Sequence, residues 1–310
     1  MNFIRGTLSA LLLTIYIAPL AAQPDSDRGQ LARWKLKEGQ KLTATLTQET
    51  KIESRLNNRS KKTKNEMTLT MDWSVDSVKD NNTEITQVIR RIQLTLQSPK
   101  MAGTTITQID TDFPDGNNEE PNSEFAEQLL KQVLPLIDVK FSTVINPLGE
   151  LMDVSIPKAS MEQLRQAPSS MQIRQILTEA GLRQMISQST IVFPENRLQP
   201  NDQWSDRLIV SAEPPVNRIQ TYTFQGREGQ GGAMVFGITS KLENNNNNTN
   251  INSSKITEFT GTGEIKFDNN SETILDSQID NSLTSRREYR DKTIRSKIDT
   301  QLKMTIKSKR

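Results

Sequence analysis

Acidic side chains gather in one stretch of the sequence, where their spacing is close to that of a calcium-binding loop. Asp110, Asp112 and Asp115 are followed by Gly116, and calcium loops place carboxylates at alternate positions around a glycine that makes the sharp turn. Here the third acid and the glycine fall one position late, and Pro114 occupies a ligand position. We therefore expect a solvated loop rather than a calcium site, and we predict no metal site.

The same stretch could supply carboxylates for general acid and base chemistry. Asp110, Asp112 and Glu119 would have to converge in a cleft to do so, and the sequence places no partner acid or base opposite them. The chain has no histidine and no cysteine, which excludes Ser/His and Cys/His nucleophiles, histidine-ligated metals and disulfides. We expect no catalytic residues, no cofactor and no enzymatic activity; a carboxylate-dependent hydrolase is the third class that stays open.

The methionines are the one feature of the sequence that suggests a ligand-binding site. Their flexible, polarizable side chains suit surfaces that accept varied apolar partners, and they also fill gaps in ordinary cores, which is the simpler interpretation. The candidate ligand-binding residues lie in or beside the predicted helical middle of the chain: Met152, Met161, Met171, Ile176 and Met185.

Two further segments have compositions that could suit a polyanion, one rich in glycine and one rich in basic residues. The glycine-rich segment 226–232 lies between predicted strands rather than ahead of a helix, so it predicts a hairpin loop and not a phosphate cradle. The basic residues of segment 286–310 alternate with acids such as Glu288 and Asp299, which is typical of a charged strand face. Because the net charge is only +2, no overall field attracts a polyanion, and we expect no nucleic-acid partner.

The N-terminus predicts export. Arg5 precedes an apolar run over residues 8–20, and this run is shorter than the roughly 18–20 residues of a membrane span. The pattern is that of a cleavable signal peptide, with an uncleaved anchor as the alternative. We expect cleavage after Ala22, so that residues 1–22 are a signal peptide and residues 23–310 form a single β-rich domain. That domain would have no integral membrane segment and would be periplasmic or extracellular.

Strands are predicted to dominate both ends of the chain, because apolar and polar residues alternate there with a period of two. Trp73 lies in the clearest such run, and the turn at residues 146–149 has proline and glycine in the positions that a hairpin needs. The predicted strands cover about residues 42–46, 67–75, 88–96, 103–109, 139–145, 152–156, 204–210, 221–225, 233–239, 256–267, 274–283 and 298–306.

Helices are predicted only in the middle, over about residues 123–187. Ser123 can cap the first helix, and Pro135 bends or ends it. A second helix is expected at about residues 159–166 and a third at 170–187, whose apolar face should lie against the sheet. The predicted fold class is therefore α+β: a large curved antiparallel β-sheet with a central helical insertion covering one face.

Five short motifs lie along the chain: Trp34 to Leu42, Ile109 to Asp112, Asn146 to Val154, Pro200 to Trp204 and Gly261 to Asp268. In this order and spacing they resemble an uncharacterised family of exported bacterial domains of unknown function. The resemblance spans nearly all of the predicted mature chain and supports export and the β-rich fold, but the family carries no activity to transfer. The expected architecture is also similar to the half-barrel lipoprotein carriers of the LolA and LppX type, which hold acyl chains between a concave sheet face and a helical lid.

We therefore expect an exported, non-catalytic protein that binds an apolar or lipidic ligand between its sheet and its helices. The alternative is a structural or protein-interaction module of the cell envelope, in which sheet and helices form a closed core. The expected partner is accordingly either a lipid or other apolar molecule, or an envelope protein.

Overall fold

A computed structural model gives the fold, and it describes residues 29–56, 59–100, 103–114, 123–166, 183, 186–187, 190–212, 215–228, 232–243, 250–251, 254–268, 270–289 and 292–309. The strands are β1 Lys41–Leu56, β2 Arg59–Lys79, β3 Asn82–Lys100, β4 Gly103–Asp110, β5 Lys140–Ile145, β6 Leu151–Ser155, β7 Gln203–Ala212, β8 Pro215–Arg227, β9 Met234–Leu242, β10 Asn250–Ile251, β11 Ser254–Asp268, β12 Thr273–Tyr289 and β13 Lys292–Ser308. The helices are α1 Glu124–Val133, the short 3-10 helix η2 Leu134–Leu136 and α2 Lys158–Gln166.

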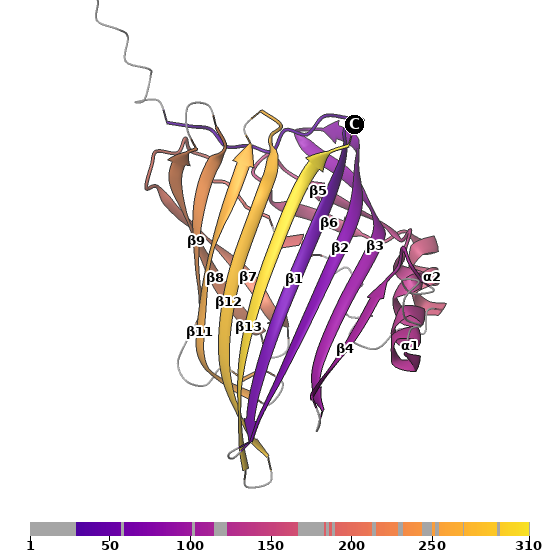
Figure 1. The fold of residues 1–310 in the computed structure, drawn as a ribbon. Coiled ribbons are helices and arrows are strands. Elements are labelled where there is room, and N and C mark those ends of the chain that lie inside the picture. The colour runs from indigo at the N-terminus through magenta and orange to yellow at the C-terminus, as the bar shows by residue number, and fades with distance from the viewer. Residues whose placement is uncertain are drawn as a thin grey trace, which may run out of the picture.

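All the described strands belong to one antiparallel sheet. Its order is β6-β5-β3-β2-β1-β13-β12-β11-β9-β8-β7, with β4 paired to β3 and β10 paired to β11. Figure 1 shows the sheet curving so that the strands at both of its ends turn behind the long central ones. The prediction of a large curved antiparallel sheet is confirmed.

The two faces of the sheet differ in chemistry because side chains alternate along each strand. On β1, Leu42, Ala44 and Leu46 are buried, whereas the intervening threonines are half-buried. Leu42 is paired with Trp73 of β2, and Leu46 with Met304 of β13, and these partners are buried on the same side. We call this side the inner face and the opposite, polar side the outer face.

The inner face is filled at the end of the sheet where β1 begins and β13 ends, at the top of Figure 1. Two covering segments, residues 30–36 and 190–198, bury large side chains there. The ring centroid of Phe193 lies 4.9 Å from that of Phe267 on β11, and that of Trp34 lies 5.6 Å from the same ring. We call this end the closed end, and the opposite end, at the β1–β2 and β12–β13 connections, the hairpin end.

The described helices α1 and α2 lie at one margin of the sheet (Figure 1). Ser123 caps α1 as predicted, its hydroxyl accepting a hydrogen bond from the Ala126 amide. The helix lies beside β4 at the margin of the sheet (Figure 1) and buries Ala126, Leu130 and Val133. A one-sided apolar stripe of this kind is satisfied by packing against a sheet margin. The predicted helical insertion over one face is therefore not shown, and most of the predicted third helix lies outside the described residues.

Within the described residues, none of the helices has the length and the apolar character that a membrane span requires. Residues 1–22, which we predict to be a signal peptide, lie outside the described residues.

Candidate ligand-binding site

Strand register aligns seven polar residues and one glycine, from eight neighbouring strands, into one row across the inner face. From β7 to β2, each member is paired with the next: Asp206, Gln220, Ser240, Gly261, Asn281, Thr300, Thr50 and Asn65. We call this the polar row. It separates the filled core of the closed end from the part of the inner face that extends toward the hairpin end.

The polar row is buried and hydrogen-bonded at Gln220 of β8 and Ser240 of β9. The Gln220 amide nitrogen donates to the Tyr222 hydroxyl at 2.8 Å, and the Ser240 hydroxyl donates to the Gln220 amide oxygen at 3.5 Å. Asn281 differs, because its Oδ1 atom is buried without a hydrogen-bond partner. Gly261 makes room for it, since a Cβ there would lie 2.5 Å from that oxygen.

Beyond the polar row, toward the hairpin end, the inner face becomes apolar again. Phe259, Leu283, Ile298 and Ile52 are paired in sequence across β11, β12, β13 and β1. Phe259 and Leu283 pack against the buried cluster of Leu242 on β9 and Ile256 on β11. We call Phe259, Leu283, Ile298, Ile52 and Leu242 the second apolar row. Unlike the core of the closed end, four of the five keep part of their surface exposed.

Arg218 of β8 lies beside this row and is the most unusual residue of the inner face. It is paired with Leu242 on one side and Leu208 on the other, and only 4% of its surface is exposed. Its Nε and Nη2 atoms have no hydrogen-bond partner, and no carboxylate of the described residues forms a salt bridge with it. Burial lowers the pKa of this guanidinium, which nevertheless stays charged in a protein.

The ionisable neighbours on the same face are also affected by burial. Burial raises the pKa of the Asp206 carboxyl and, more strongly, that of the Tyr222 hydroxyl. The Tyr222 ring stacks on Trp204 with centroids 5.4 Å apart, and the Trp204 indole donates to the Val192 carbonyl at 2.7 Å. The β7–β8 side of the inner face is thus a closely packed, poorly solvated surface.

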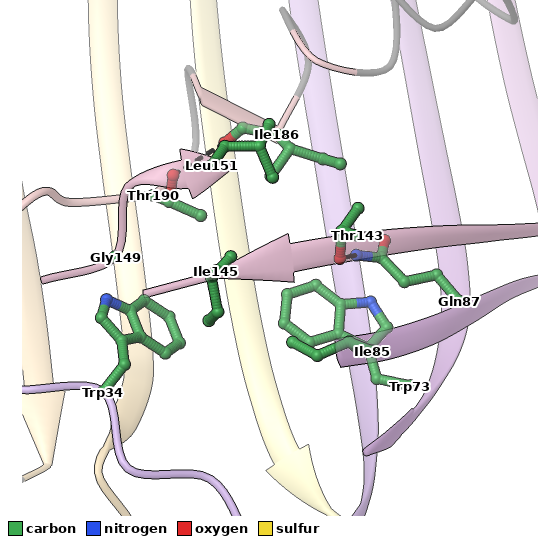
Figure 2. Close-up of a pocket in the computed structure, with 10 residues that line it drawn as sticks. All are labelled: Trp34, Trp73, Ile85, Gln87, Thr143, Ile145, Gly149, Leu151, Ile186 and Thr190. Carbon is green, nitrogen blue, oxygen red and sulfur yellow. Dashed lines mark hydrogen bonds between the residues drawn. The ribbon is translucent and has the colours of Figure 1, made fainter. Parts of the chain in front are cut away.

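A small cavity lies at the closed end, between β2, β3, β5, β6 and Trp34 (Figure 2). Its volume is about 20 Å³, enough for one water molecule and far too little for a lipid chain. Two of its lining atoms, Trp73 Nε1 and Gln87 Oε1, have no hydrogen-bond partner, while Gln87 Nε2 donates to Thr143 at 3.0 Å. The cavity therefore suits a buried water rather than a ligand.

A larger hollow of about 300 Å³ on the outer face is lined mainly by polar and charged residues of β1, β11, β12 and β13. Its carboxylates already have partners: Asp299 accepts from Ser282 at 2.6 Å, Asp280 from Gln301 at 2.7 Å, and Glu49 lies 2.7 Å from Lys51. Hydrogen bonds to these neighbours lower the pKa values of Asp299 and Glu49. Within the described residues no group of three acidic side chains could hold a metal ion.

Of the predicted ligand-binding residues, the structure describes two. Met152 on β6 is 54% exposed, and Met161 on α2 packs against the buried core. Met171, Ile176 and Met185 lie outside the described residues. Neither Met152 nor Met161 belongs to the second apolar row.

The acidic stretch considered for calcium begins with an ion pair. Asp110 accepts hydrogen bonds from Nε and Nη2 of Arg91, the first at 2.9 Å, and Arg91 also lies 3.3 Å from Asp112. The Arg91 contact is the main cause of the lowered Asp110 pKa. Asp115, Gly116 and Glu119 lie outside the described residues.

Arg218 is not among the candidate residues predicted from the sequence, although the alternation of residues along β8 could have identified it. Arg218, Gln220, Tyr222 and Phe224 alternate along β8 and are all buried. The predicted strand begins only at residue 221, so Arg218 falls outside the alternating run.

Comparisons with solved structures include lipovitellin among the proteins of similar fold. Lipovitellin, in "Lipid-protein interactions in lipovitellin", is 11% identical with a TM-score of 0.50; the match covers 89% of this chain and 26% of the lipovitellin chain. An outer membrane channel from Pseudomonas putida F1, "COG4313", is 7% identical over 88% of this chain and 97% of its own, with a TM-score of only 0.23.

No curated protein matches the sequence. Residues 87–274 match the model of a family of unknown function, DUF6263. This match confirms the expected resemblance to a family without an assigned role. Because it covers more than half of the chain, the chain belongs to the family of unknown function DUF6263.

Proposed function

We propose that the protein binds an apolar or lipidic ligand on the inner face of its sheet, without catalysing a reaction. The observation that carries this proposal is the second apolar row, where Ile52, Leu283 and Ile298 stay partly exposed on the same face as the filled core. Each buried CH₂ group contributes about 0.8 kcal/mol when removed from water, so an acyl chain placed along this row would be stabilised by apolar burial.

The fold supports this proposal by analogy. Lipovitellin has a similar fold, and the solved structure concerns its lipid–protein interactions. This chain spans only 26% of that chain's length, so we transfer the lipid-binding role as a proposal and not the activity of the whole protein. The proposed site differs from the one expected between sheet and helices, because the described helices α1 and α2 lie at the margin of the sheet.

Binding is proposed rather than catalysis because of the residues available. The chain has neither histidine nor cysteine, and the Asp110 carboxylate is held by Arg91 instead of facing a second free acid. We further propose a periplasmic or extracellular location, on the strength of the N-terminal signal pattern.

The proposal is tested with the mature chain, residues 23–310, purified without delipidating steps. Native mass spectrometry is expected to show a co-purified lipid, and a fluorescent fatty-acid probe is expected to bind the delipidated protein. Ile298→Gln, on the second apolar row, should weaken probe binding. The matched control Lys297→Gln lies next to it on the outer face, facing Glu53 of β1, and should leave binding unchanged.

Absence of both a co-purified lipid and probe binding would overturn the proposal. In that case the alternative, a protein-interaction module of the cell envelope, would be pursued by affinity capture from envelope extracts.

A further inference from the structure

We propose that Arg218 binds the anionic head group, a carboxylate or a phosphate, of an amphiphile whose apolar chain lies along the second apolar row. This inference rests on the proposed function of the inner face and names the class of ligand.

Because Arg218 is buried and charged, an anionic partner would stabilise it. A buried charge is costly unless it is paired and hydrogen-bonded, and a guanidinium does not escape that cost by losing its proton. Arg218 is 4% exposed, is flanked in register by Leu208 and Leu242, and has two nitrogen atoms without partners. Asp206, on the adjacent strand, is in register with Gln220 instead. Among the described residues Arg218 therefore has no acid to neutralise it.

The unpartnered atoms have the geometry for a two-oxygen ligand. Nε and Nη2 are neighbouring donors on one edge of the planar guanidinium, and such an edge binds a carboxylate or phosphate through two parallel hydrogen bonds. The protein itself contains this arrangement at Arg91, whose Nε and Nη2 donate to the two oxygens of Asp110. Arg218 presents the same edge with no carboxylate on it.

The second apolar row is long enough for an acyl chain that starts at Arg218. From β8 the inner face continues through β9, β11, β12 and β13 to Ile52 on β1. Adjacent strands lie about 4.8 Å apart, so this path measures roughly 24 Å along the sheet. One layer of lipid chains occupies roughly 15 Å, half of the hydrocarbon core of a bilayer.

The experiment compares ligands that share one chain but differ in charge. Oleate, oleoyl lysophosphatidate and the neutral oleyl alcohol are titrated into the delipidated mature protein below their aggregation concentrations, with inorganic phosphate as the chain-free anion. The wild-type protein is expected to bind the two anionic amphiphiles roughly tenfold or more tightly than the alcohol, as charge-assisted hydrogen bonds allow. Inorganic phosphate alone should bind far more weakly.

Arg218→Met should abolish the preference for anionic amphiphiles while leaving the affinity for oleyl alcohol within about twofold, because the second apolar row is unchanged. Arg218→Lys keeps the charge but loses the two-donor edge, so it should retain only part of the preference. The matched control is Arg207→Met on β7, where an exposed arginine pairs with Glu243. In this variant the preference for anionic amphiphiles should persist.

Thermal unfolding checks that each variant is folded. Arg218→Met is expected to raise the melting temperature of the ligand-free protein, since it removes a buried unpaired charge.

The outcomes separate this inference from the proposed function. A preference for anions that survives Arg218→Met, equal binding of oleate and oleyl alcohol by the wild-type protein, or tight binding of inorganic phosphate alone would overturn the inference. Failure of every amphiphile to bind would overturn the proposed function as well.

Discussion

The indole of Trp34 lies against the backbone of Gly149, so closely that a Cβ at Gly149 would be 2.5 Å from Trp34 Nε1 and 2.4 Å from the Ile191 carbonyl oxygen. This contact joins the β5–β6 turn to both covering segments, because the Trp34 indole also donates to Ile191 at 3.3 Å. The closed end of the sheet depends on a glycine at this position.

Gly149→Ala is expected to lower the free energy of unfolding by about 3 kcal/mol, through a left-handed backbone conformation combined with overpacking. The φ angle of Gly149 is +90°. Gly39→Ala is the matched control, because Gly39 also has a positive φ, +78°, but a Cβ added there would meet no atom within 4 Å; it should cost only about 1 kcal/mol. Chemical denaturation measures both, and equal losses would contradict the proposed steric contact.

Trp73→Ala is expected to cost about 3–5 kcal/mol, because the side chain is buried on the inner face opposite Leu42. Val78→Ala on the same strand is the control, since Val78 is exposed and its truncation should stay within about 0.5 kcal/mol. Thermal and urea unfolding report both changes. A shift of only a degree or two for Trp73→Ala would mean that the faces of β2 are misassigned.

The cavity between β2, β3, β5 and β6 is expected to hold one water molecule that accepts from Trp73 Nε1 and donates to Gln87 Oε1. Both atoms are buried without a protein partner beside a space of about 20 Å³, and buried polar groups are normally paired with protein or water. A high-resolution crystal structure of the wild-type protein would show the density. Trp73→Phe removes one of the two partners and should lower the occupancy of that water.

Local pattern predicts which way individual side chains point. The alternation over residues 67–75 predicts that Trp73 points inward, and Trp73 is buried in β2. Proline and glycine in segment 146–149 predict the hairpin that β5 and β6 form. Both features depend on residues within a few positions of one another, where steric preferences of the backbone decide the result.

Register between distant strands could not be predicted in this way. Thr50 joins the polar row because β1 pairs with β13, whose partner residue Thr300 lies far along the chain, and alternation does not specify which strands become neighbours. The predicted first strand ends at residue 46, whereas β1 continues to Leu56, because polar residues occupy both faces there and the alternation is lost. The burial of Arg218 could not be predicted either, because the two leucines that flank it belong to neighbouring strands.

The Arg91–Asp110 ion pair predicts a specific pH dependence of stability. Contact with Arg91 lowers the Asp110 pKa below its ordinary value of 3.8, so the folded state binds a proton less readily than the unfolded state there. The resulting stabilisation is present above pH 3.8 and is lost as the pH falls through the lower, folded-state pKa. Arg91→Met should therefore reduce stability at pH 7 and flatten its decline below about pH 4. Lys35→Met, which breaks an exposed pair with Glu272, is the control and should leave the decline of stability at acidic pH as steep as in the wild-type protein.

Asn281 and Gln220 of the polar row should respond in opposite ways to the same substitution. Asn281 Oδ1 is buried without a partner, so Asn281→Leu removes an unsatisfied acceptor and joins the filled core to the second apolar row; it is expected to be neutral or to stabilise by about 1 kcal/mol. Gln220→Leu deprives the Tyr222 hydroxyl and the Ser240 hydroxyl of their shared partner, and should cost about 1–3 kcal/mol. Urea unfolding of the two variants measures the difference. Equal destabilisation would show that the Asn281 oxygen is satisfied in solution, and would identify a bound water in the polar row as the group to look for next.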